Sequence, residues 1–301
     1  MENGIEISHI SKGYGEIKAL DDISLTIQPG ELFGLIGPDG AGKTSLFRIL
    51  TTLLLPDKGD ATVCGLDIRK QFNEIRCRVG YMPGHFSLYQ DLTVEENLKF
   101  FATVFHTSIE ENYDLISHIY RQIEPFKHRR TGKLSGGMKQ KLALCCALVH
   151  RPEVLFLDEP TTGVDPVSRT ECWDMLARLK SQGITILVST PYMDEATQCD
   201  RIALLREGRC LSVDTPDGIR SNFKHPLLAV KANDMYTLLK DLRNYPLTDM
   251  CFSFGNVHHL TLKRSEEGEE RKLLDYLNQK NYKNIFIQPI EPSIEDCFML
   301  L

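Results

Sequence analysis

Short apolar runs alternate with helical patterns over the first two thirds of the chain. Three of these runs lack the polar alternation of a half-exposed strand: Leu32–Ile36, Val154–Leu157 and Ile184–Ser189. Such runs are typical of strands that are buried on both faces. Each precedes or follows a helical pattern, over residues 45–54, 135–149 and 167–181. The order predicts an α/β domain with a mostly parallel core sheet.

Two further parts of this domain are predicted around the core strands. The apolar positions of 5–10 and 19–27 predict antiparallel N-terminal strands. From about Gln71 to Lys133 the apolar spacing is helical. We therefore expect a helical subdomain over about 85–150.

The last part of the chain has a different pattern. From residue 222 the elements are predicted in the order β-α-β-β-α-β, followed by a short terminal helix. That order is typical of a small ferredoxin-like α+β unit. We expect two domains, over residues 1–221 and 222–301.

The composition of the chain argues against several classes of protein. The chain has 301 residues, with Lys+Arg 35 against Asp+Glu 41 and a formal net charge of −6. That balance argues against a nucleic-acid partner. The nine cysteines form no C-x-x-C pair, which favours reduced thiols over a disulfide framework. No apolar run approaches the roughly 18 residues that a membrane-spanning helix needs, so we expect any membrane attachment to come through partners.

The first chemical motif directly follows the first core strand. It consists of Gly37, Pro38, Asp39, Gly40, Ala41, Gly42, Lys43 and Thr44, with Ser45 next, and it matches G-x-x-x-x-G-K-[ST]. In such a P-loop, backbone N–H groups and a helix N-terminus surround a phosphate. We expect Lys43 to reach the β- and γ-phosphates of ATP and the Thr44 hydroxyl to ligate Mg²⁺.

A second motif ends the strand that begins at Val154. Asp158 and Glu159 stand at its carboxyl end, where ligands bind in open α/β sheets. We expect Asp158 to hold Mg²⁺ through water and Glu159 to act as the general base that orients the attacking water.

A third motif, Leu134-Ser135-Gly136-Gly137, resembles the signature of ABC-type ATPases. The resemblance covers residues from 3 to about 220 and implies that Ser135, Gly136 and Gly137 contact ATP held by a second nucleotide-binding domain. It also implies that Tyr14 stacks on adenine and that Asp165, in the D-loop, faces across the dimer. The segment Glu291–Phe298 resembles the end of the drug- and multidrug-export branch.

Two positions depart from the family pattern. Gly84 stands where the family has the Q-loop glutamine, and Pro191 stands where it has the switch histidine. Glycine offers no ligand side chain, and proline lacks both a polar side chain and a backbone N–H. We expect the chain's own ATP site to be degenerate, with slow or absent hydrolysis.

The leading hypothesis is a cytoplasmic ATP-binding subunit of an export complex, held at the inner face of the membrane by transmembrane permease subunits. It would pair with a second nucleotide-binding domain, in a homodimer or, as the degenerate positions favour, a heterodimer. The surface over about Phe86–Phe105 either docks a permease or belongs to the core. The alternatives are a soluble non-transport ABC ATPase and an ATP-bound scaffold subunit with little hydrolysis.

Overall fold

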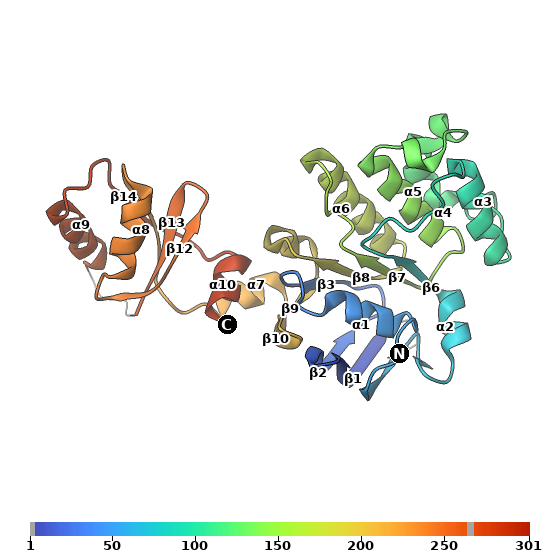
Figure 1. Cartoon of the computed structure of the whole chain (residues 1–301), viewed down its shortest axis with the longest axis horizontal. Helices are drawn as coiled ribbons and strands as arrows, with labels where there is room; N and C mark the ends of the chain where they lie inside the picture. Colours follow the sequence, from blue (N-terminus) through green and yellow to red (C-terminus); the bar gives the residue numbers. More distant parts are fainter. Residues whose placement is uncertain (1–3, 264–267) are drawn as a thin grey trace. The chain divides into compact units, whose positions relative to one another are not determined.

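The computed structural model describes residues 4–263 and 268–301; residues 1–3 and 264–267 lie outside it. The chain divides into two compact units, Met1–Pro216 and Asp217–Leu301 (Figure 1). This division lies N-terminal of the 221/222 boundary expected from the sequence. The reason is α7 (Pro216–Ser221), most of which belongs to the second unit, where the Cys297 thiol lies 3.7 Å from the Ile219 carbonyl oxygen.

The first unit is built on a six-stranded sheet with the order β10-β9-β3-β8-β7-β6. Neighbouring strands from β9 to β6 are parallel, and β10 joins β9 antiparallel. The predicted α/β class with a mostly parallel core is confirmed. The strands are β3 (Leu32–Ile36), β6 (Val79–Met82), β7 (Val154–Asp158), β8 (Thr185–Thr190), β9 (Arg201–Arg206) and β10 (Arg209–Asp214).

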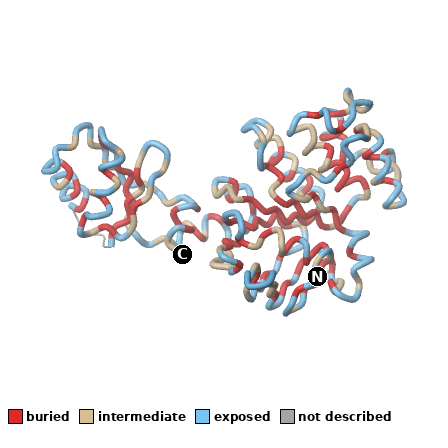
Figure 2. Tube along the Cα trace, in the orientation of Figure 1, coloured by how far each residue is buried: buried red, intermediate tan, exposed pale blue. Residues whose placement is uncertain are grey.

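The three predicted core strands form the centre of this sheet. Every residue of β3, β7 and β8 is buried, and Figure 2 shows the buried positions concentrated along these strands. Burial on both faces explains why their sequences are continuous apolar runs. Strands β6, β9 and β10 were not predicted individually; β6 interrupts the 71–133 stretch that was expected to be helical, since it follows α2 (Phe72–Arg78) directly.

An antiparallel sheet with the order β2-β1-β4-β5 covers one side of the unit. The helix α1 (Lys43–Leu50) contacts β2 and β4 of this sheet as well as β7 of the central one. Its Phe47 ring meets Phe156 of β7 edge-on, with ring centroids 5.8 Å apart. The strands are β1 (Ile5–Tyr14), β2 (Ile17–Ile27), β4 (Lys58–Val63) and β5 (Leu66–Asp67).

Helices α3, α4, α5 and α6 lie on the side of the central sheet opposite α1 (Figure 1). Thr93 and Glu96 form a capping box at the start of α3 (Val94–Val104). The others are α4 (Tyr113–Ile123), η1 (Glu124–Phe126), η2 (Thr131–Lys133), α5 (Gly136–Leu148), α6 (Pro166–Ser181) and η3 (Met193–Gln198).

The second unit has the element order that the sequence predicts. Its four antiparallel strands have the order β12-β13-β11-β14, with α8 and α9 as the connections of a β-α-β-β-α-β unit. The elements are β11 (Leu227–Lys231), α8 (Met235–Arg243), β12 (Thr248–Phe254), β13 (Val257–Leu262), α9 (Glu269–Gln279), β14 (Phe286–Pro289) and α10 (Ile294–Leu300).

Candidate nucleotide-binding site

The P-loop connects β3 to α1 at the carboxyl edge of the central sheet. Two of its glycines have no room for a side chain. A Cβ on Gly37 would lie 2.2 Å from the Leu205 carbonyl oxygen, and a Cβ on Gly42 would lie 2.3 Å from that of Ala19. Gly42 also has a φ of +100°, which L side chains rarely adopt. The surrounding backbone therefore holds the loop in a conformation that only glycine permits.

Lys43 is buried at the centre of this loop. Its Nζ donates to the carbonyl oxygens of Gly37 at 2.7 Å and Pro38 at 3.0 Å. The same Nζ lies 3.5 Å from Oε1 of Glu159. The P-loop lysine and the carboxylate expected to act as general base are thus brought together across the end of the sheet.

The carboxyl end of β7 is held by β8. Oδ1 of the buried Asp158 accepts a 2.6 Å hydrogen bond from the Ser189 hydroxyl. Glu159 has a φ of +52°, and its N–H donates to the Ser189 carbonyl oxygen at 3.1 Å and to its hydroxyl at 3.0 Å. Ser189 therefore orients both carboxylate residues. This role of Ser189 was not predicted from the sequence, although a hydroxyl near the end of a buried strand was a visible signal.

The donor set suits Mg²⁺. Thr44 lines the P-loop cavity together with Glu159, and Asp158 stands beside it at the end of β7. The Oδ2 atom of Asp158 is free of the bond to Ser189. A hydroxyl and a carboxylate, completed by phosphate oxygens and water, match the hard oxygen ligands that Mg²⁺ prefers.

Tyr14 stands beside the P-loop helix. Its phenol oxygen lies 3.4 Å from the Ser45 hydroxyl, and its ring is half exposed. The Lys12 ammonium lies 5.9 Å from the centre of that ring. The Tyr14 ring is therefore partly accessible next to the P-loop, with the Lys12 ammonium over one of its faces.

Gly84 lies against the end of β7, beside the backbone of Asp158 and Glu159. A Cβ at this position would be 3.2 Å from the Asp158 carbonyl oxygen and 3.8 Å from the Glu159 Cβ. The backbone here is so close to β7 that a glutamine side chain would require a small shift of the loop.

Pro191 directly follows β8, whose last residue, Thr190, accepts the Gly37 N–H with its carbonyl oxygen at 3.3 Å. Both departures from the family pattern lie at the edge of this site.

The signature residues lie elsewhere. The Ser135 hydroxyl caps α5, and the exposed Gly136 follows it. A Cβ on Gly137 would lie 3.1 Å from the Ser168 hydroxyl, so this glycine lets α5 approach α6 closely. None of these residues lines the P-loop cavity, whose described lining residues are Ala19, Asp39, Gly40, Ala41, Gly42, Lys43, Thr44, Ser45 and Glu159.

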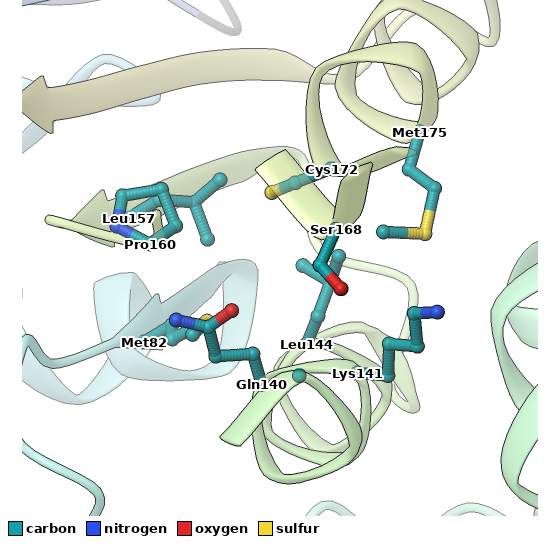
Figure 3. Close-up of a pocket in the computed structure, with 10 residues that line it drawn as sticks. Met82, Gln140, Lys141, Leu144, Leu157, Pro160, Ser168, Cys172 and Met175 are labelled. Atoms are coloured by element: carbon teal, nitrogen blue, oxygen red, sulfur yellow. The ribbon is translucent and has the colours of Figure 1, made fainter. Parts of the chain in front are cut away.

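The D-loop lies beside the signature helix. Asp165 caps α6 by accepting from the Ser168 N–H at 3.0 Å and from its hydroxyl at 2.8 Å, and these bonds lower the pKa of the exposed Asp165 carboxyl. Gln140 of α5 donates to the Thr162 carbonyl oxygen at 3.4 Å. Figure 3 shows Gln140 and Lys141 of α5 across a small pocket from Ser168 of α6. The signature and the D-loop therefore form one surface.

A groove of about 530 Å³ lies at the other end of α5 and is lined mostly by apolar side chains. Leu53 and Val104 line it and are 59% and 53% exposed. His150 also lines it, stacked on Phe105 with ring centroids 3.7 Å apart. Burial lowers the pKa of His150 to about 4, although the bond to the Val79 carbonyl oxygen acts to raise it.

The sequence predicted that the surface over Phe86–Phe105 either docks a permease or belongs to the core. In this surface, Leu88 is buried and Tyr89 is half exposed.

Among residues 4–263 and 268–301, no helix has the length and apolar character that crossing a membrane would require. In the same residues, no three His, Cys, Asp or Glu side chains form a group that could hold a metal ion by themselves. A Mg²⁺ site here would depend on phosphate oxygens.

Comparisons with known proteins show the family to which the chain belongs. A family model described as ABC transporter matches residues 20–162. The chain is 40% identical over 222 residues to the probable multidrug ABC transporter ATP-binding protein YbhF of Escherichia coli (strain K12), covering 73% of this chain and 38% of that protein's length. It is also 40% identical to the daunorubicin resistance ATP-binding protein DrrA2 of Streptomyces coeruleorubidus, covering 70% and 67%. The Nod factor export ATP-binding protein I of Paraburkholderia xenovorans (strain LB400) is 39% identical, covering 72% and 73%.

Solved structures show the same fold. An ATP-binding subunit of an ABC transporter superposes with a TM-score of 0.67 at 29% identity, over 73% of this chain and 92% of that one. The dimeric bacterial ABC transporter cassette MJ0796 gives a TM-score of 0.64 at 26% identity, over 70% and 98%. By sequence, fold and motif order, this chain belongs to the ATP-binding subunits of the ABC transporter family.

Proposed function

We propose that this chain binds and hydrolyses ATP, slowly at its own site, as a subunit of an export complex at the inner face of a membrane. The observation that carries the proposal is the convergence of Lys43, Thr44, Asp158 and Glu159 at one edge of the central sheet. Export is favoured because the relatives reported above are named for multidrug, daunorubicin and Nod factor transport.

The roles follow from the chemistry of the residues. The P-loop N–H groups and Lys43 bind the phosphates. These groups also stabilise the negative charge that develops on the phosphate oxygens during transfer. Mg²⁺, held by Thr44 and Asp158, would supply further neutralisation of the β- and γ-phosphate oxygens. Glu159 orients the attacking water and takes its proton. Tyr14 stacks on the adenine.

The separation of the motifs supports pairing with a second nucleotide-binding domain. Ser135, Gly136 and Asp165 are exposed and lie outside the chain's own P-loop cavity. Val167, next to the D-loop, is 69% exposed. We infer that Ser135, Gly136 and Gly137 complete the ATP site of the partner domain, whose signature in turn completes the site of this chain.

Gly84 and Pro191 support an asymmetric pair. Neither residue provides a side chain that could sense the γ-phosphate, so this chain's site holds ATP longer than a fully equipped site would. We infer a heterodimer in which the partner hydrolyses faster. The same two residues favour a second candidate function, an ATP-bound scaffold subunit with little hydrolysis.

The apolar groove supports a permease partner. Exposed Leu53 and Val104 on its lining are costly in water and would be covered by an apolar segment of another protein. We infer that a cytoplasmic segment of a transmembrane subunit docks there and transmits closure of the ATP dimer.

The test is the ATPase activity of the purified chain, with and without partners isolated from solubilised membranes. We expect slow turnover alone, faster turnover in the complex, and loss of the chain's own contribution in Glu159→Gln. Robust, cooperative turnover by the chain alone would contradict the asymmetric pair. No turnover in any setting would favour the scaffold, and copurification with ribosomes instead of membranes would favour a non-transport ATPase.

A further inference from the structure

Glu195 is a buried carboxylate that the roles assigned above do not use. It lies on η3 and is 3% exposed. A buried charge is tolerated only where charged and polar partners compensate its lost hydration. Its partners come from three different segments of the chain, so the position of each segment is tied to this one side chain.

One oxygen of Glu195 joins the D-loop to the end of β8. Its Oε2 accepts a hydrogen bond from the Thr161 hydroxyl at 3.0 Å and another from the Thr190 hydroxyl at 2.5 Å. Thr161 begins the D-loop segment just after Asp158. Thr190 is the last residue of β8, and its carbonyl oxygen accepts the Gly37 N–H of the P-loop. The Glu195 carboxylate thus connects the end of β8, which bonds to the P-loop, with the start of the D-loop segment.

The other oxygen joins α6. Oε1 of Glu195 accepts from the Arg169 guanidinium at 3.0 Å, and Arg169 also pairs with Asp194 at 3.1 Å. The neighbour of Arg169 on α6 is Ser168, whose N–H and hydroxyl both hold Asp165. The connection therefore runs from the P-loop backbone through Glu195 to the aspartate that ends the D-loop.

We propose that Glu195 is a positioning residue that couples the P-loop end of β8 to the D-loop, so that nucleotide binding in this chain is relayed to Asp165. The proposal rests on the proposed function only in assuming that the P-loop binds ATP. This route matters because Pro191 lacks the polar side chain of the switch histidine. Thr190, next to Pro191, bonds to the P-loop with its carbonyl oxygen and to Glu195 with its hydroxyl, so a movement of the P-loop would also move Glu195. The relay passes from one ATP site toward the partner-facing surface without the switch histidine.

The fluorescence of one tryptophan can be used to follow this relay. Trp173, on α6, is the single tryptophan of the sequence. Its ring lines a cavity of about 280 Å³ together with Arg169 and Glu195. The indole Nε1 is buried without a hydrogen-bond partner among the described residues, so its fluorescence is sensitive to small changes in this cavity.

The experiment titrates the full-length chain with Mg²⁺ and a non-hydrolysable ATP analogue. Calorimetry gives the dissociation constant, and the emission of Trp173 reports the relay. Thr161→Val removes one hydroxyl at nearly constant volume and leaves Glu195 paired with Arg169 and Thr190, so the fold is retained. Thr161→Ser keeps the hydroxyl. Thr170→Val is the matched control, because Thr170 lines the same cavity but donates to the Pro166 carbonyl oxygen at 3.2 Å.

We expect nucleotide to change the Trp173 emission in the wild type, in Thr161→Ser and in Thr170→Val. In Thr161→Val the change falls at least about twofold, while the dissociation constant moves by less than about twofold. A full emission change in Thr161→Val would overturn the relay. So would nucleotide binding without any emission change in the wild type. Absence of nucleotide binding in the calorimeter would instead overturn the proposed function, and the relay with it.

Discussion

The Ser189 hydroxyl donates a 2.6 Å hydrogen bond to Oδ1 of Asp158, although the two residues are 31 positions apart. The bond joins the carboxyl ends of β7 and β8 and leaves the second carboxylate oxygen, Oδ2, free of Ser189. Partners of metal-binding carboxylates are often as important as the ligands themselves.

Ser189→Ala is therefore expected to weaken Mg²⁺ binding to the nucleotide complex by about 10-fold, in the range typical of such outer partners. Nucleotide binding without Mg²⁺ should change little. The measurement is a Mg²⁺ titration at a fixed concentration of fluorescent ATP analogue. Ser181→Ala, at the exposed end of α6, is the control, and an unchanged Mg²⁺ midpoint in Ser189→Ala would remove this role from Ser189.

Lys43→Met should abolish tight nucleotide binding. The variant removes the cation expected to contact the phosphates and leaves the carbonyl oxygens of Gly37 and Pro38 without their donor. A hydrogen bond to a charged group contributes about 1.5–3 kcal/mol, which corresponds to a rise in dissociation constant of at least about 10-fold. Calorimetry with ATP measures it, with exposed Lys58→Met as the control. Equal affinity in the two variants would contradict the P-loop assignment.

Replacing Gly84 by glutamine and Pro191 by histidine should raise the rate of ATP hydrolysis only when both substitutions are made together. Gly84→Gln alone places a Cβ 3.2 Å from the Asp158 carbonyl oxygen, so the loop must shift before the side chain can act. Pro191→His alone restores a polar side chain without the glutamine. We expect the double variant to hydrolyse at least about 10-fold faster than either single one.

This prediction is measured as phosphate release, with thermal unfolding as the check on stability. Adding Glu159→Gln to the double variant must remove the gain, which ties it to this site. A double variant no faster than the wild type would show that the site is not limited by Gly84 and Pro191.

His150 should make the stability of the fold depend on pH. Its pKa is lowered to about 4 in the folded state, so between about pH 6.5 and 4 the unfolded chain binds more protons than the folded one. The stabilisation is present above pH 6.5 and is lost as the pH falls through this window. We expect a loss of about 3 kcal/mol from this residue by pH 4.

The measurement is urea unfolding at several pH values. His150→Gln keeps a donor for the Val79 carbonyl oxygen but does not titrate, so its stability should fall less steeply across the same window. Parallel pH profiles for the wild type and His150→Gln would exclude His150 as the titrating group.

Leu53→Asp and Val104→Asp should weaken binding of a permease partner at the apolar groove. Both side chains are more than half exposed, so the substitutions leave folding and nucleotide affinity nearly unchanged. Copurification from solubilised membranes should fall at least about 10-fold because a charge would be buried on docking. Tyr236→Asp, at an exposed position of the second unit, is the control, and equal recovery of partners in all variants would argue against the groove.

Much of the fold was predictable because its signals are local. The apolar runs of β3, β7 and β8 and the capping box at Thr93 are read from neighbouring residues. The missed strands β6 and β9 are less distinctive in sequence, and their place at either side of the central strands depends on pairing with distant segments.

By itself, the sequence determined where the P-loop, the carboxylates after β7 and the signature stand in the chain, because each is a contiguous segment with its own residue pattern. Only the tertiary structure decided that the Ser189 hydroxyl holds the Asp158 carboxylate, that Gly84 lies against the Asp158 backbone carbonyl, and that Glu195 joins Thr161 to Thr190. These contacts link residues far apart in the chain. They follow from the order of β6, β7 and β8 in the sheet, which a buried apolar strand does not specify because its residues would pack equally well beside several neighbours.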